Sequence, residues 1–287
     1  MNEVLQDLLT VLNIEQLEIN LYRGESRDLG GRSVFGGQVL GQALMAAYAT
    51  VEEHLAHSMH AYFLRPGDMN APIVYQVERL RDGRSFVARR IHAIQHGHTI
   101  FSMIASFQAP EEGLEHQVEM PEVPGPDELA SQAELRERWL SDCPEKLRAG
   151  WMRELAIEFK PVDPQNPFKP KVEPPEQHIW FRAAGRLPDG LTLHHAVLAY
   201  ASDFNFLGTA MRPHGVNWFS KGMVSASLDH ALWLHRPFRA DEWLLYSMDS
   251  PSSSGARGMN RGLIFNQAGE LVATDMQEGL MRKTDNT

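Results

Sequence analysis

Two segments of the chain carry apolar residues at helical spacing and almost no charge. They are residues 34–51 (VFGGQVLGQALMAAYATV) and residues 193–206 (LHHAVLAYASDFNF). A helix at the surface of a globular protein normally keeps one charged face, so two helices without such a face are expected to be buried on most sides. A third helical pattern at the N-terminus predicts a short amphipathic helix, with its stripe at Val4, Leu5, Leu8, Leu9 and Leu12.

Short runs of strand-like residues follow each of the two buried helices. Residues 73–77 and 243–246 are apolar runs, and residues 99–107 and 270–277 alternate between apolar and polar. The alternating runs come directly after Gly-containing turns, His96-Gly97 in the first case and Ala268-Gly269 in the second. Short strands separated by such turns predict an antiparallel sheet in each half of the chain.

The two sets of elements form an internal repeat. HAYFLRPGD begins at His60 and HALWLHRPF begins at His230, and each is followed by a strand run, a Gly/Ser/Arg turn and a hairpin in the same order. One buried helix wrapped by an antiparallel sheet is the hotdog arrangement. The pattern therefore predicts an α+β double hotdog, in which two antiparallel sheets each wrap a long helix and join as one continuous sheet. The copies share few identical residues, so the alternative is a chance similarity between two ordinary sheet segments.

The repeat divides the chain into an N-terminal hotdog over 1–110, a linker over 111–150 and a C-terminal hotdog over 151–287. The connecting stretch is rich in proline and acidic residues, which is typical of a surface connector. Within it, residues 131–140 predict an exposed helix.

Composition and charge restrict the possible partners and the compartment. With 27 basic and 37 acidic residues, a formal charge of −10 disfavours nucleic acid. Cys143 is the only cysteine, which excludes an intrachain disulfide. The N-terminus lacks the basic start of a secretory signal, residues 34–51 are too polar for a membrane span, and the terminal KTDNT is not a peroxisomal address. We therefore expect a cytoplasmic protein with no membrane partner.

Several common catalytic and cofactor motifs are absent from the sequence. There is no G-x-S-x-G nucleophile elbow, no dinucleotide-binding G-x-G-x-x-G and no phosphate-binding loop. None of the thirteen histidines has the neighbouring glutamate of a zinc-protease helix. We therefore expect neither a metal nor a cofactor.

Asp203 stands out because it lies near the C-terminal end of the second buried helix. A carboxylate in apolar surroundings costs several kcal/mol to bury unless it is hydrogen-bonded. Asp203 is thus a catalytic candidate, with capping of a neighbouring backbone amide as the alternative. Its apolar neighbours in the sequence are Leu198, Tyr200, Phe204, Phe206 and Leu207.

Ser227 and Gln277 gain interest from the repeat. Ser227 is expected at the start of a strand and Gln277 on the last strand, and both strands must enclose the helix that bears Asp203. The facing positions in the first half carry His57 and Ala105. This difference is what a duplicated fold with one working site would show, although each residue alone could be an ordinary strand residue.

Over nearly its whole length the sequence resembles the bacterial acyl-CoA thioesterase II family. The resemblance is carried by nine separate segments: YRGESRDLG, RSVFGGQVLGQAL, HSMHAYFLRPGD, LRDGRSFVARR, ASFQAPEEG, YASDFNFLGTA, LDHALWLHRPF, EWLLYS and ARGMNRGLIFNQAGELVATDMQEGLMR. It implies a double hotdog protein that hydrolyses acyl-CoA thioesters of medium or long chain length to fatty acid and coenzyme A. It also implies a catalytic group of Asp203, Ser227 and Gln277, with Ser where relatives often have Thr. The histidine of HS-x-H, His57, is implied near the site as a substrate-binding wall residue.

For the mechanism we expect Asp203 to act as a general base on water, with Ser227 and Gln277 orienting that water. Backbone amides at the Gly36-Gly37 helix start, or alternatively near the helix of Asp203, are candidates to bind the oxyanion. The competing mechanism makes Ser227 a nucleophile with a histidine base. His230 is nearby in sequence, but residues 227 and 230 of one strand would point to opposite faces.

Two other function classes fit the same fold. One is an acyl-CoA hydratase, whose chemistry usually uses an Asp/His pair, and the other is a non-catalytic acyl-CoA binder. Because hotdog sheets commonly pair at their edges, a homo-oligomer, dimer or tetramer, is expected. Six arginines are candidates for the coenzyme A phosphates: Arg65, Arg84, Arg89, Arg90, Arg257 and Arg261.

Overall fold

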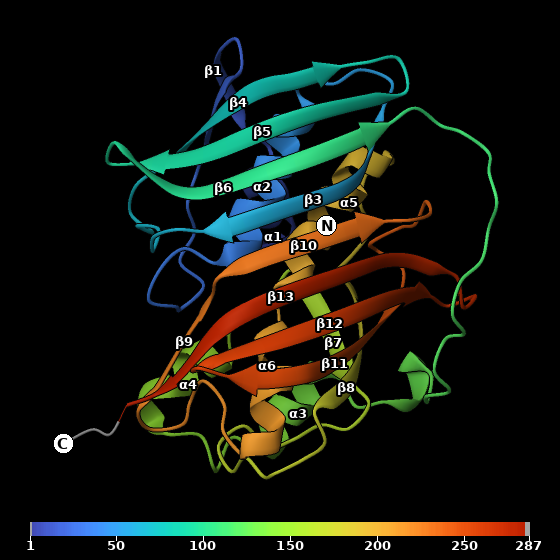
Figure 1. The fold of residues 1–287 in the computed structure, drawn as a ribbon. Helices are drawn as coiled ribbons and strands as arrows, with labels where there is room; N and C mark the ends of the chain where they lie inside the picture. The colour runs from blue at the N-terminus through green and yellow to red at the C-terminus, as the bar shows by residue number, and fades with distance from the viewer. Residues whose placement is uncertain (1, 285–287) are drawn as a thin grey trace.

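The structure, a computed structural model, describes residues 2–284, and thirteen strands of this part of the chain form one antiparallel sheet (Figure 1). The N-terminal strands run in the order β1-β2-β4-β5-β6-β3, and the C-terminal strands continue as β10-β13-β12-β11-β8-β7, with β9 paired to β13. The strands are β1 (Glu15–Glu18), β2 (Leu21–Gly24), β3 (Leu55–Phe63), β4 (Ile73–Asp82), β5 (Phe86–Gln95), β6 (His98–Gln108), β7 (Ile157–Pro161), β8 (Glu176–Ala183), β9 (Met223–Ser227), β10 (Asp229–Leu234), β11 (Leu244–Ser254), β12 (Arg257–Asn266) and β13 (Leu271–Lys283).

The helices lie against one face of this sheet or in the connecting segment between the two halves. They are α1 (Glu3–Leu12), α2 (Gly36–Tyr48), α3 (Gln132–Arg138), α4 (Arg148–Trp151), α5 (Leu191–Ser202) and α6 (Phe206–Met211), with 3-10 turns η1 (Pro126–Glu128), η2 (Glu145–Leu147) and η3 (Arg212–His214). None of the helices between residues 2 and 284 is long and apolar enough to cross a membrane.

The predicted helices are confirmed, with one correction to a boundary and one to exposure, because α3 within 131–140 buries Leu135 and Arg136. The segment 34–51 contains α2, and the N-terminal stripe forms α1, which Asn2 caps by accepting the amide of Leu5 at 2.9 Å. The segment 193–206 is not one helix, because α5 ends at Ser202 and Asn205 takes a left-handed conformation before α6 begins. This break places Asp203 at the C-cap of α5, close to the predicted helix end.

The predicted hairpins also form. His96 and Gly97 both have positive φ between β5 and β6, which matches the tight two-residue turn that the twist of a hairpin favours. Gly269 has φ of 84° between β12 and β13. The turn glycines therefore set the register of both hairpins.

The two halves join through the pairing of β3 with β10. Ala61 pairs with His230 and His60 pairs with Ala231, so the His-Ala pairs that open the two repeated segments lie opposite each other. The same segment of each repeat thus lies on either side of the junction, as a two-fold relation between the halves requires. The predicted continuous sheet is therefore confirmed, with its centre at this strand pair.

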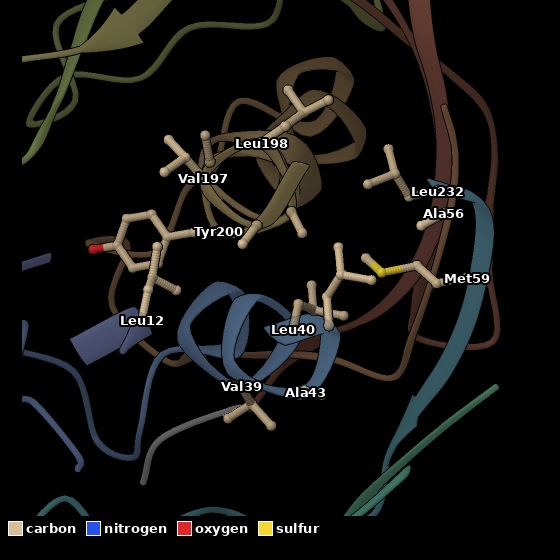
Figure 2. Packing of buried hydrophobic residues seen from close by; sticks show 14 of the residues in the cluster. Leu12, Val39, Leu40, Ala43, Ala56, Met59, Val197, Leu198, Tyr200 and Leu232 are labelled. Atoms are coloured by element: carbon tan, nitrogen blue, oxygen red, sulfur yellow. The ribbon is translucent and has the colours of Figure 1, made fainter. Parts of the chain in front are cut away.

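Helices α2 and α5 pack side by side against this central part of the sheet (Figure 2). Figure 2 shows α2, with Leu40 and Ala43, next to α5, with Val197 and Leu198, and places Met59 and Leu232 of the sheet to the right of the two helices. Glycines on α2 permit the close approach, since a Cβ at Gly37 would lie 2.2 Å from the carbonyl oxygen of Tyr200. The near absence of charge on α2 and α5 therefore reflects the burial of each helix against the other as well as against the sheet.

Candidate active site

Asp203 projects from the C-terminal end of α5 toward the N-terminus of α2. Its Oδ2 accepts the backbone N–H of Gly37 at 2.9 Å. A Cβ at Gly36 would lie 2.6 Å from the same oxygen and 3.0 Å from the ring of Phe63. Only glycine at position 36 lets the carboxylate reach the helix end, where the free amide and the helix dipole both favour negative charge.

Ser227 and Gln277 reach the other oxygen of the same carboxylate from the sheet. The Ser227 hydroxyl donates to Asp203 Oδ1 at 3.0 Å, and Gln277 Nε2 donates to the same oxygen at 2.6 Å. Ser227 is the last residue of β9, not the first residue of a strand as the sequence suggested. Gln277 lies within β13, which pairs with β9, β10 and β12, and it is 1% exposed. The structure thus brings the three predicted residues together around one carboxylate.

The surroundings change the acidity of this carboxyl group. Burial raises the pKa of Asp203 from 3.8 to about 6, against hydrogen bonds from Gln277, Ser227 and Gly37 that lower it. A carboxylate that is ionised at neutral pH, yet more basic than an ordinary aspartate, is suited to accept a proton.

Gly36 and Gly37 were candidates to bind the oxyanion of the substrate. The Gly37 amide already donates to Asp203 Oδ2. Its role as an oxyanion donor stays a prediction, and it requires the carboxylate to release this bond. What the geometry shows is that the missing side chain of Gly36 lets the Asp203 carboxylate approach the N-terminus of α2.

His57 is not in contact with the three residues. Its Nε2 lies 2.8 Å from the hydroxyl of Ser106, and its ring packs against Phe86. The strand pairing also corrects which residue of the first half corresponds to Ser227. Ser227 pairs with Gly279 on β13, and the counterpart of Gly279 on β6 is Phe107. Phe107 pairs with Ala56 and not with His57. A bulge between Ala56 and Ser58 causes this shift of one residue.

A buried polar network behind Asp203 was missed in the sequence. The hydroxyl of Tyr246 bonds both to the carbonyl oxygen of Ser202 and to Oδ2 of Asp275. Tyrosine has one proton to donate, so both bonds are satisfied when Asp275 is protonated and donates to the tyrosine oxygen. Burial indeed raises the pKa of Asp275 well above 3.8. Strand alternation could have pointed to Asp275, because it lies two residues before Gln277 and faces the same side of β13.

His230 belongs to the same network. It is 1% exposed; its Nδ1 lies 3.2 Å from Gln277 Nε2 and its Nε2 lies 3.0 Å from the hydroxyl of Ser202. The sequence argument that 227 and 230 point to opposite faces does not apply, because the strand is interrupted at Leu228. Both ring nitrogens are nevertheless directed to Gln277 and Ser202, not to Ser227.

The arginine candidates differ in their availability to a ligand. Arg89 is 1% exposed and donates to Thr50 and Asp82, so the suggestion that it binds the coenzyme A phosphates is wrong. Three of the others form ion pairs at the surface, Arg90 with Glu78, Arg257 with Glu278 and Arg261 with Asp249. Such exposed pairs are weak and open readily to an incoming phosphate.

Comparison with known proteins decides which family the chain belongs to. Residues 151–280 match the acyl-CoA thioesterase family, and residues 25–108 match the acyl-CoA thioesterase N-terminal domain. Acyl-CoA thioesterase 2 of Haemophilus influenzae is 43% identical over 98% of this chain and 99% of its own length. The chain belongs to the acyl-CoA thioesterase II family.

Further relatives of this thioesterase agree in sequence and in fold. Human acyl-coenzyme A thioesterase 8 is 43% identical over 95% of this chain and 88% of its own length. An acyl-CoA thioesterase II from Mycobacterium marinum superposes with a TM-score of 0.79 at 42% identity, covering 97% of this chain and 99% of that one. A hot dog fold protein of Alicyclobacillus acidocaldarius has a TM-score of 0.78 at 18% identity, over 97% and 98% of the two chains, and confirms the hotdog fold. The thioesterase therefore hydrolyses acyl-CoA thioesters.

Proposed function

We propose that Asp203 activates a water molecule, which attacks the thioester carbonyl of the acyl-CoA directly. The observation that carries this proposal is the set of donors on the two carboxylate oxygens. Oδ1 accepts from Ser227 and Gln277, whereas the one donor to Oδ2 within residues 2–284 is the Gly37 amide. A lone pair of Oδ2 is therefore available to take the proton of the attacking water. The tetrahedral intermediate then collapses, the C–S bond breaks, and coenzyme A leaves as a thiolate that takes up a proton.

The competing mechanism uses Ser227 as a nucleophile and forms an acyl-enzyme. A serine nucleophile normally has a histidine base beside it. Among residues 2–284, the hydrogen-bond partner of the Ser227 hydroxyl is Asp203, and His230 bonds elsewhere. Water attack is the mechanism that this arrangement favours.

We further propose that the substrates are fatty acyl-CoA molecules of medium to long chain length. A cavity of about 260 Å³ lies between α6 and the β7–β8 edge of the sheet, and Asn205 lines it two residues after Asp203. Its wall is mostly apolar and includes the aromatic residues Trp139, Trp151, Phe159, Trp218 and Phe219. Such a wall, reached two residues along the chain from Asp203, suits an alkyl chain.

The proposal is tested by following free thiol release from palmitoyl-CoA, together with single-turnover analysis in oxygen-18 water. Rapid thiol release and one labelled oxygen in the fatty acid, with no acyl-enzyme detected by mass spectrometry, are expected. An acyl group trapped on Ser227 would refute direct water attack. Hydration of an unsaturated acyl-CoA, or binding without thiol release, would point to the hydratase or to the non-catalytic binder.

Three further expectations remain part of the proposal. We propose that 1–110 and 151–287 act as two hotdog units joined by 111–150, which agrees with the repeated strand order on either side of β3 and β10. A homo-oligomer is proposed because both ends of the sheet, β1 and β7, are edge strands. A cytoplasmic location is proposed because Cys143 is the only cysteine, which suits a reducing compartment.

A further inference from the structure

His230 has one hydrogen-bond partner for each ring nitrogen, and the directions of these bonds can be worked out. The Ser202 hydroxyl donates to the carbonyl oxygen of Ala199 at 3.1 Å. A hydroxyl has one proton, so toward His230 it can only accept, and the imidazole must carry its proton on Nε2. Nδ1 is then a lone pair that accepts from Gln277 Nε2. Ser202 thus fixes the tautomer of His230.

This tautomer in turn fixes the amide of Gln277. The two hydrogens on Nε2 are directed to Asp203 Oδ1 and to His230 Nδ1. A flipped amide would place its carbonyl oxygen against a carboxylate oxygen and a nitrogen lone pair, two repulsive contacts. The observed orientation is held even though Oε1 of Gln277 is buried without a partner among residues 2–284. An unpaired buried oxygen is unfavourable, so the two bonds on the nitrogen side must outweigh its cost.

The surroundings keep His230 neutral over the whole working range of an enzyme. Its ring is buried against Phe206, and burial lowers the pKa of His230 to about 3. The nearby Asp203 does not contact the ring and is reached through the amide of Gln277. A neutral ring offers a constant acceptor to that amide.

We propose that His230 is a positioning residue of the thioesterase reaction, whose Nδ1 lone pair, with its tautomer set by Ser202, holds Gln277 as a donor to Asp203. The inference rests on the proposed role of Asp203 as the base. Losing this orientation removes one of the donors that lower the pKa of Asp203. The base then titrates at a higher pH and its carboxylate is less firmly held.

The test compares His230→Leu, which removes the acceptor, with His230→Asn, whose side-chain oxygen takes the place of Nδ1. With palmitoyl-CoA, His230→Leu is expected to lower kcat by about 10-fold or more at a KM within about twofold of wild type. The acidic limb of its kcat/KM profile should move to higher pH. His230→Asn should recover most of kcat and the wild-type limb. Equal losses of kcat in both variants, with an unmoved acidic limb, would mean that His230 only fills space and would overturn the inference.

Two measurements keep the inference testable if His230→Leu does not fold. Ser202→Ala removes the hydroxyl that sets the tautomer, and it should also move the acidic limb upward. Nitrogen-15 spectra of labelled histidine in the wild-type enzyme should show His230 with its proton on Nε2, and a proton on Nδ1 would contradict the inference. Asp203→Asn separates the two proposals: a fully active Asp203→Asn overturns the proposed base, whereas an inactive Asp203→Asn beside a normal His230→Leu overturns only the role of His230.

Discussion

Replacing Asp203 with asparagine should abolish most of the activity and also make the protein more stable at neutral pH. The variant lacks a base, and loss of a positioned general base lowers kcat by about 10²–10⁴-fold. The gain in stability has a separate origin. In the wild type the ionised Asp203 carboxylate is buried, which is unfavourable, and asparagine removes that charge.

The size of the gain follows from the pKa of the carboxyl group in the two states. A rise from 3.8 in the unfolded chain to about 6 in the folded protein corresponds to about 3 kcal/mol at pH 7, since each pH unit is about 1.4 kcal/mol. Asparagine keeps the acceptor for Ser227 and Gln277 but turns an N–H toward the Gly37 amide. This contact forfeits one hydrogen bond, about 1 kcal/mol. The net expectation is a gain of about 2 kcal/mol, or roughly 4–8 °C in Tm.

The pH dependence gives the sign of this effect. A carboxyl group whose pKa is raised by folding favours the folded state below pH 3.8, and this contribution is lost as the pH rises toward 6. The advantage of Asp203→Asn should therefore grow by about 2 kcal/mol between pH 4.5 and pH 7.5, and then stay constant. Urea unfolding of the wild type and of Asp203→Asn at several pH values measures it. An advantage that does not change with pH would refute the raised pKa.

Three further predictions concern the cavity, the helix end and the buried acid. Val216→Trp narrows the cavity and should lower kcat/KM for palmitoyl-CoA more than for hexanoyl-CoA. The control Val172→Trp, at a site 72% exposed, should leave the ratio of the two kcat/KM values unchanged. The same ratio in both variants would show that this cavity does not bind the acyl chain. Gly36→Ala places a Cβ 2.6 Å from Asp203 Oδ2 and should lower kcat by about 10-fold or more while circular dichroism stays native; full activity would show that the carboxylate does not need this approach. Asp275→Asn should keep kcat within about twofold. It should be more stable than the wild type at pH 8 but not at pH 4, because folding at pH 8 requires the wild-type carboxyl group to take up a proton. A loss of stability at pH 8 would argue for an ionised Asp275 in the folded protein.

The sequence by itself determined the elements and the candidate carboxylate. The uncharged helical patterns identified α2 and α5, because a helix without a polar face has no stable place at the surface. The turn at His96-Gly97 identified a hairpin, because such a turn requires positive φ. Asp203 stood out because a carboxylate among apolar residues needs compensating donors.

Only the tertiary structure decided which groups meet Asp203 and how the network behind it is protonated. The donor at Gly37 lies in the other half of the chain, and nothing in a local pattern predicts a contact between the N-terminus of one helix and the C-cap of another. The bulge at His57 shifted the register by one residue, which changes the face of every following side chain. The roles of His230 and Asp275 depend on single protons placed by three-dimensional partners, and such partners are far apart in sequence.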